Sequence, residues 1–232
     1  MADDWTTEDA YDELAESYRE DAEEDAYNAH LEFPCTTELI PDVDGLRVLD
    51  VGCGGGRYTE WLLDHGAEVV GVDASEGMLT EARERVGDRA TLHRGNIDSS
   101  LDFARDDAFD GVVCSLVLDY VEDWRAPLRE FARVLDDGGF LVLSARHPFD
   151  EFPIADDENY FTVERRIADW AVEVPYYRRP LTEMLTPLLE TGFRLDAVRE
   201  PEPTAAFARQ RPDAYEKESR QPVFLCLRAV RP

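Results

Sequence analysis

Short apolar runs alternate with amphipathic stretches along the central part of the chain. The apolar runs are rich in Val, Leu and Phe and occupy residues 47–51, 68–72, 90–93, 109–114 and 139–143. Runs of this length and composition are typical of strands buried inside a sheet. The pattern therefore predicts a series of short, buried β-strands.

Three stretches between these runs carry apolar residues at helical spacing, at residues 56–65, 75–86 and 125–135. Ser75 is the expected N-cap of the second helix, and the third ends at Leu135, in front of Asp-Asp-Gly-Gly. Strands that alternate with helices are joined by right-handed crossovers, which produce a parallel sheet covered on both faces. The predicted fold class is a doubly wound α/β sandwich.

The C-terminal part continues this pattern with two interruptions. Residues 181–191 predict a helix, and residues 193–199 and 223–230 predict two more strands that pair like a hairpin. The result is a seven-stranded, mostly parallel sheet with an antiparallel last strand. The segments 146–180 and 200–222 are rich in proline and do not resemble linkers, and the N-terminal 30 residues predict an acidic helical arm.

Length and composition indicate a single globular domain. The chain has 232 residues, of which 44% are hydrophobic, so it can bury a core without disulfides or a structural metal. Its four cysteines stand far apart, which favours reduced thiols in a cytoplasmic protein. The N-terminus is acidic and no apolar run is long enough to span a bilayer, so we expect neither secretion nor membrane insertion.

The charge balance is strongly acidic. Asp and Glu number 52 against 24 basic residues, which gives a formal net charge of −28, and Lys217 is the single lysine. Such a charge repels phosphate backbones, which disfavours a nucleic-acid partner. An acid-rich, lysine-poor surface also resembles proteins of extreme halophiles, in which concentrated salt screens the self-repulsion.

A glycine-rich loop follows the first predicted strand and precedes a helix. Asp50 ends the strand, and glycines stand at 52, 54 and 56. Glycines let the backbone turn tightly and approach a ligand, and the helix start adds free N–H groups. A nicotinamide-dinucleotide fingerprint would need a glycine at position 57, where this chain has Arg57. An acid just before the loop favours a ligand that presents an ammonium group instead.

The segment from Val48 to Gly56 resembles the first motif of class I S-adenosylmethionine-dependent methyltransferases of the type 11 group, which have a Rossmann-like fold. The resemblance implies S-adenosylmethionine as cofactor and extends, in order and spacing, over residues 47–145. It implies that Asp73 accepts hydrogen bonds from the ribose hydroxyls, that Met78 contacts the adenine, and that Asn96 accepts from the adenine amino group. The implied cofactor-binding residues are Asp50, Gly52, Cys53, Gly54, Gly56, Asp73, Ala74, Met78, Asn96, Ile97, Ser115, Leu116, Tyr120 and Tyr18.

The loop after the fourth strand, which contains Ser115, Leu116 and Tyr120, resembles the one beneath the transferable methyl group, but Asp119 stands where many relatives have His. In the N-terminal arm, Tyr18 resembles an aromatic residue that closes over the cofactor.

Candidate catalytic residues follow the fifth strand. Methyl transfer from a sulfonium is an in-line displacement, so the protein contributes mainly by positioning and by excluding water. His147 is the candidate base or substrate donor, and Tyr177 is expected to face the substrate. The alternatives are that His147 satisfies a turn and that Arg178 and Arg179 form ion pairs. The four histidines are scattered without an i, i+4 pair, so no metal site is expected.

Three functions compete at this stage. The first is an S-adenosylmethionine-dependent methyltransferase with a small-molecule acceptor, the second an RNA- or tRNA-directed methyltransferase of the same fold, and the third a non-catalytic module that binds the adenosyl ligand. Residues 1–232 are expected to form one methyltransferase domain. It divides into an arm (1–45), a cofactor-binding core (46–145) and two substrate-cap insertions (146–180 and 200–222). The oligomeric state does not follow from the sequence.

Overall fold

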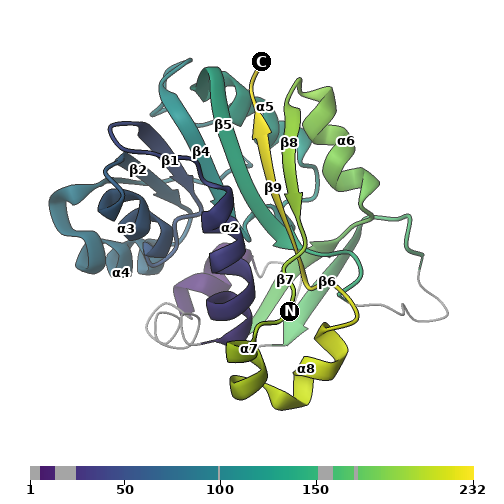
Figure 1. Cartoon of the computed structure of the whole chain (residues 1–232). Helices are drawn as coiled ribbons and strands as arrows, with labels where there is room; N and C mark the ends of the chain where they lie inside the picture. The colour runs from purple at the N-terminus through teal and green to yellow at the C-terminus, as the bar shows by residue number, and fades with distance from the viewer. Residues whose placement is uncertain (1–5, 14–24, 99, 151–158, 170–171) are drawn as a thin grey trace.

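A seven-stranded sheet forms the centre of the protein in a computed structural model, which describes residues 6–13, 25–98, 100–150, 159–169 and 172–232. The strand order is β3-β2-β1-β4-β5-β9-β8 (Figure 1). The strands are β1 (Arg47–Val51), β2 (Glu68–Asp73), β3 (Thr91–Arg94), β4 (Phe109–Ser115), β5 (Leu135–Arg146), β8 (Arg194–Arg199) and β9 (Phe224–Val230). Strands β1 to β5 run parallel, and β9 is antiparallel to β5 and β8. The predicted fold class, including the antiparallel last strand, is confirmed.

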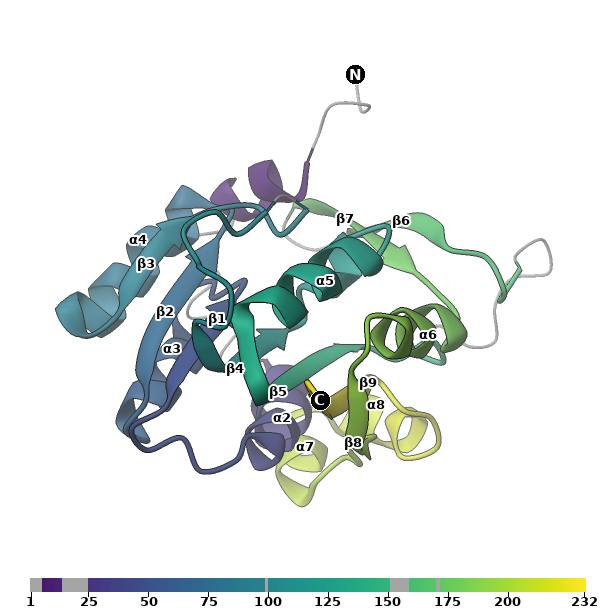
Figure 2. The ribbon, with the colours of Figure 1, turned by 90° about the horizontal axis from the view of Figure 1, so that it is seen from above.

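Helices cover both faces of this sheet (Figure 2). Alternate strand residues point to opposite faces, so Leu49 and Val51 belong to one buried cluster and Val48 to the other. The first cluster includes α5 and α6, and the second includes α2, α3 and α7. The labelled helices are η1 (Asn28–Glu32, a π-helix), α2 (Phe33–Leu39), α3 (Arg57–Asp64), α4 (Glu76–Val86), η2 (Gly87–Arg89), η3 (Leu118–Tyr120), α5 (Arg125–Val134), α6 (Thr182–Glu190), α7 (Ala205–Gln210) and α8 (Pro212–Glu218). In the part of the chain that the structure describes, no helix has the length and apolarity needed to cross a membrane.

The fifth strand begins earlier than predicted. Helix α5 ends at Val134 and β5 begins at Leu135, four residues before the predicted start at Gly139. The Asp-Asp-Gly-Gly segment joins the sheet because Gly138 N–H donates to the Arg231 carbonyl at 3.0 Å. The pairing of β4 with β5 is irregular at this point. Polar residues can therefore occupy a strand that the apolar pattern does not reveal.

The insertion between β5 and α6 contains a hairpin that the sequence analysis did not predict. Strands β6 (Glu164–Asp169) and β7 (Glu173–Arg178) pair antiparallel in a sheet of their own. The sequence of β6 has no apolar face and β7 contains Pro175, so neither shows the usual strand pattern. A helical segment at residues 7–13 lies beside β7 (Figure 2), where Thr7 Oγ1 donates to the Pro175 carbonyl at 3.3 Å.

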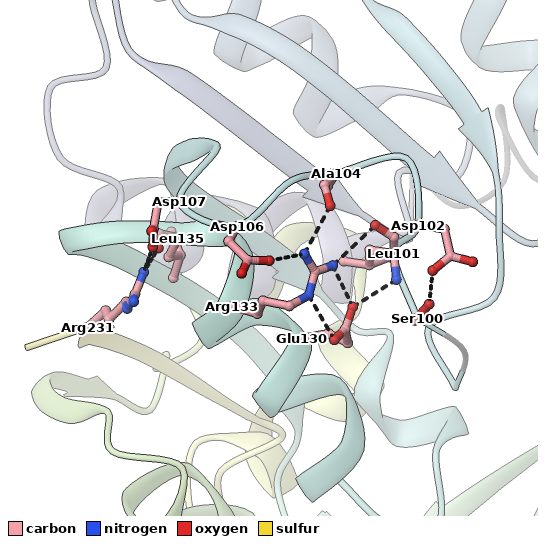
Figure 3. A network of polar contacts seen from close by, with 10 residues as sticks. All are labelled: Ser100, Leu101, Asp102, Ala104, Asp106, Asp107, Glu130, Arg133, Leu135 and Arg231. Carbon is pink, nitrogen blue, oxygen red and sulfur yellow. Dashed lines mark hydrogen bonds and ion pairs between the residues drawn. The ribbon is translucent and has the colours of Figure 1, made fainter.

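A polar network on the α5 side fixes the connection between β3 and β4 (Figure 3). Arg133 of α5 donates to the carbonyls of Ala104 and Leu101 at 3.0 and 3.2 Å, and it also binds the carboxylates of Asp106 and Glu130. Glu130 in turn accepts from the Leu101 N–H at 2.9 Å. One guanidinium thus ties several backbone groups of this connection to the helix.

Candidate functional site

The loop after β1 turns through three glycines with positive φ, Gly52 (66°), Gly54 (51°) and Gly56 (83°). Other residues adopt such angles at a cost in free energy. At Gly52 space also excludes a side chain, because a Cβ there would lie 2.1 Å from Cγ2 of Val117. Gly56 is the N-cap residue of α3. The chain therefore needs glycine to bring this loop beneath the start of the helix.

Asp73 at the end of β2 connects this loop to the next helix. Its Oδ2 accepts from the Gly54 N–H at 2.8 Å, and its Oδ1 accepts from the Ser75 N–H at 2.9 Å. Burial raises the pKa of Asp73, and these backbone donors oppose the rise. Ser75 caps α4 as predicted, since its Oγ accepts from the Met78 N–H at 3.0 Å. Asp73 is therefore held with both carboxylate oxygens at the carboxyl edge of the sheet.

The turn after β4 contains a backbone conformation that is rare for a branched side chain. Leu116 has φ of +54°, and its N–H donates to the Ser144 carbonyl at 3.0 Å and to Ser144 Oγ at 3.2 Å. Strained residues of this kind persist only where their surroundings hold them, and they concentrate at functional sites. Ser115 and Leu116 thereby form a fixed wall beside the glycine loop.

Residues of the N-terminal segment close over the carboxyl edge of the sheet. Tyr11 Oη lies 2.5 Å from Tyr120 Oη. Asp12 accepts from Ser75 Oγ at 2.5 Å and from the Gly77 N–H at 3.1 Å. These contacts hold the helical segment at residues 7–13 against α4 and the loop that follows β4.

Together these elements enclose a cavity of about 480 Å³. A volume of this size accommodates a small organic ligand. The predicted site residues that line it are Gly52, Cys53, Gly54, Asp73, Ala74, Met78, Asn96, Ile97, Ser115, Leu116, Tyr120 and Tyr177. Residues from four parallel strands, the arm and the β6–β7 hairpin thus converge on one cavity, as the rule for open α/β sheets predicts.

Asp50 and Gly56 belong to the loop but do not line the cavity, and Tyr18 lies outside the described residues. The Asp50 side chain lies behind the loop with only 1% of the residue's surface exposed, and Thr59 Oγ1 donates to its Oδ2 at 2.5 Å. Burial raises the pKa of Asp50 to about 7. This acid therefore supports the loop from inside the protein.

His147 lines a second, much smaller cavity of about 20 Å³ and not the large one. Its Nδ1 accepts from the Phe149 N–H at 3.1 Å, so Nε2 carries the proton and pairs with Glu200 at 3.0 Å. Burial lowers the pKa of His147. Tyr177 contributes to the walls of both cavities.

Asp119 also faces the small cavity, where its Oδ2 accepts from the Arg146 N–H at 2.9 Å. Burial raises the pKa of Asp119 to about 6. The residue that replaces the usual His of the loop after β4 thus points away from the large cavity.

Sequence reasoning missed Glu32 and Arg57, which both line the large cavity. Glu32 ends η1, and only 2% of its surface is exposed. Nothing in the sequence distinguishes it from the many surface acids of this chain. Arg57 lies at the start of α3, with its guanidinium 3.9 Å from the centre of the Phe33 ring. In the sequence, Arg57 shows only that the third glycine of a nicotinamide-dinucleotide fingerprint is absent.

Comparisons with known proteins agree on one family. A model described as a methyltransferase domain matches residues 49–143. A demethylmenaquinone methyltransferase of Symbiobacterium thermophilum is 36% identical over 70% of this chain and 68% of its own length. A ubiquinone biosynthesis O-methyltransferase of Xanthomonas oryzae is 37% identical, but the match covers only 44% of each chain. The crystal structure of an S-adenosylmethionine-dependent methyltransferase from Mesorhizobium loti has a TM-score of 0.77 and 32% identity, covering 90% of this chain and 99% of that one.

Proposed function

The chain belongs to the class I S-adenosylmethionine-dependent methyltransferases of the type 11 group, and from this membership we propose that it methylates a small-molecule acceptor. S-adenosylmethionine is the cofactor of these enzymes and supplies an electrophilic methyl group on a sulfonium. The observation that carries the proposal is the cavity of about 480 Å³ in which most of the predicted cofactor residues meet the aromatic residues of the arm and the hairpin. Its charges fit a cationic cofactor, because the lining includes Glu8, Glu32, Asp73 and Asp98 against Arg57 and Arg165.

We propose that the adenosine half of the cofactor lies over β2 and β3. Asp73 would accept from the ribose hydroxyls, since its two oxygens can each take more than one hydrogen bond. Asn96, Ile97, Ala74 and Met78 would surround the adenine. This assignment is supported by their common position on the cavity wall.

The middle and the far end of the cavity complete the proposed cofactor site. The backbone of Gly52, Cys53 and Gly54 would contact the ligand closely, and Ser115, Leu116 and Tyr120 would line the methionine end. Asp50 and Gly56 would act indirectly, by holding the loop from behind. Tyr18 remains a prediction from the sequence.

The acceptor would bind beside Tyr177, which the hairpin presents to the cavity together with Pro175. The tyrosine hydroxyl can orient a polar group, and the surrounding side chains exclude water from the methyl group. His147 would influence the acceptor through Tyr177, since it lies on the wall of the adjoining small cavity. Relatives named for quinone substrates support a small-molecule acceptor, and the net charge of −28 disfavours a nucleic acid.

We further propose that residues 1–232 form one methyltransferase domain. In it, residues 46–145 hold the cofactor, residues 1–45 close over it, and residues 146–180 and 200–222 form the acceptor side. The excess of acids and the single lysine support a halophilic protein that works in concentrated salt, and the unpaired cysteines support a cytoplasmic location.

Calorimetric titration with S-adenosylhomocysteine and NAD in about 1 M KCl, where the Debye length is about 3 Å, tests the cofactor site. We expect binding of the adenosyl ligand, no heat with NAD, and an affinity at least about 100-fold lower for Asp73→Ala, because hydrogen bonds to a charged group are lost. Asp64→Ala, which changes an exposed carboxylate of α3, should bind like the wild type. Folded protein that binds NAD instead would refute the cofactor site, and methyl transfer to tRNA but to no small molecule would refute the acceptor class.

A further inference from the structure

Glu32 is a buried carboxylate in the wall of the large cavity. Only 2% of the residue's surface is exposed, and its Oε1 accepts from Thr36 Oγ1 at 2.8 Å, from Ser115 Oγ at 2.8 Å and from Ser144 Oγ at 2.6 Å. Tyr58 Oη also donates to it, at 2.8 and 2.9 Å from the two carboxylate oxygens. Hydroxyl groups from α2, α3, β4 and β5 therefore converge on one carboxylate.

No cationic side chain of the described part of the chain forms an ion pair with Glu32. The hydrogen bonds that Glu32 accepts from the described residues come from neutral hydroxyls, which can stabilise an anion but cannot neutralise it. A buried charge is costly unless an opposite charge accompanies it. The cavity beside Glu32 is therefore a favourable place for a cationic group of a ligand.

The position of Glu32 along the cavity indicates which end of the cofactor would lie beside it. Asp73 and Asn96, the proposed adenosine contacts, follow β2 and β3 at one side of the sheet. Glu32 contacts Ser115 and Ser144 on β4 and β5, which lie on the opposite side of β1. Glu32 thus lies at the end of the cavity away from the proposed adenosine half.

We infer that Glu32 is the anion that binds the ammonium group at the amino-acid end of S-adenosylmethionine. This inference rests on the proposed cofactor site and deepens it. Asp50, the acid that the sequence suggests for this role, does not line the cavity. Arg57 lines the same cavity and carries the charge that the α-carboxylate of the ligand requires.

Glu32 also has a purely structural function from which the binding function must be separated. Ser144 donates to Glu32 and accepts from the N–H of Leu116, so Glu32 helps to hold the strained turn after β4. A substitution could therefore lower affinity by disturbing this turn. A ligand that lacks the amino-acid end distinguishes the two effects, because it still needs an intact cavity.

The test compares Glu32→Gln with the wild type by calorimetry, using S-adenosylhomocysteine and 5′-methylthioadenosine. The second compound keeps the adenosine and the sulfur but has no ammonium group. We expect Glu32→Gln to bind S-adenosylhomocysteine about 10- to 100-fold more weakly, the range for a hydrogen bond to a charged group, and to bind 5′-methylthioadenosine with unchanged affinity. Glu218→Gln is the matched control, since Glu218 is 5% exposed and does not line the cavity. It should bind both compounds like the wild type.

Three results would overturn the inference. Equal losses for both compounds in Glu32→Gln would assign Glu32 to the structure of the turn alone. Unchanged affinity for S-adenosylhomocysteine would remove Glu32 from the site. A loss confined to Asp50→Asn, measured in the same series, would return the ammonium contact to Asp50. Failure of the wild type to bind either compound would instead refute the proposed cofactor site itself, so the two failures are distinguishable.

Discussion

Ionisation of Asp50 should make the folded protein less stable as the pH rises. This carboxylate is 1% exposed and has Thr59 Oγ1 as its hydrogen-bond donor, at 2.5 Å. Burial raises its pKa from 3.8 to about 7, and the nearby Asp73 adds to the rise. Asn at position 50 keeps the volume and the acceptor oxygen but carries no charge at any pH. Asp50→Asn therefore isolates the effect of the charge.

The sign and size of the effect follow from the two pKa values. Between pH 3.8 and about 7 the folded state binds more protons at this residue than the unfolded state does. The stabilisation from the neutral carboxyl is therefore complete below the unfolded pKa and is lost as the pH rises to the folded pKa. As the pH rises from about 5 to about 7, the free energy of unfolding falls by up to about 3 kcal/mol, because each pH unit in this interval contributes about 1.36 kcal/mol.

Urea denaturation of both proteins in about 1 M KCl, at several values between about pH 5 and pH 8.5, measures this difference. The free energy of unfolding of Asp50→Asn should exceed that of the wild type by an amount that grows by about 2–3 kcal/mol over this range and then levels off. Asp64→Asn, in which the altered carboxylate is exposed, should show a constant difference. A constant difference for Asp50→Asn, or a wild type that gains stability over the variant with rising pH, would refute the reasoning.

Two other substitutions test the glycine loop after β1 and the Arg133 network drawn in Figure 3. Gly52→Ala would place a Cβ 2.1 Å from Val117 and should weaken S-adenosylhomocysteine binding more than about tenfold by calorimetry. Gly138→Ala is the control, because its Cβ would meet open space at φ +80°. It should cost only about 1 kcal/mol of stability and leave the affinity unchanged. Equal affinities of the two variants would contradict the steric argument. Arg133→Met should lower the free energy of unfolding in urea by about 1–3 kcal/mol, against less than about 0.5 kcal/mol for the exposed Arg220→Met. Equal free energies of unfolding for the two arginine variants would mean that the Arg133 network does not stabilise the folded protein.

The fold could be predicted because the inner strands of its sheet are largely buried. Segments 47–51 and 109–114 are mostly apolar because most of their residues are buried between two helical layers, and this leaves a clear sequence signal. The hairpin β6–β7 left no such signal, since β6 is charged and only partly buried, and the mostly buried β7 contains Pro175 and Arg178. The early start of β5 was hidden for the same reason, as Asp136 and Asp137 are exposed strand residues.

The convergence of most proposed cofactor residues on one cavity could be predicted because parallel strands end at a common edge. Asp73 and Asn96 follow neighbouring strands, so their convergence follows from topology. The direction of a side chain at a strand end is harder to infer. His147 follows β5 at this edge, yet its ring turns toward Glu200. The contribution of Glu32 depends on a helix that packs across the sheet, and no local pattern reveals such a contact.

Strands β6 and β7 form a sheet of their own, separate from the seven-stranded sheet whose strands hold the glycine loop and Asp73. The hairpin contributes Arg165, Pro175 and Tyr177 to the cavity wall, while the other strands keep their own hydrogen-bond ladder. Substitutions within the hairpin can change the wall of the cavity without altering the register of the strands that hold the glycine loop and Asp73. With the acceptor beside Tyr177, as proposed, the hairpin is the segment to exchange with a relative when a different acceptor is sought.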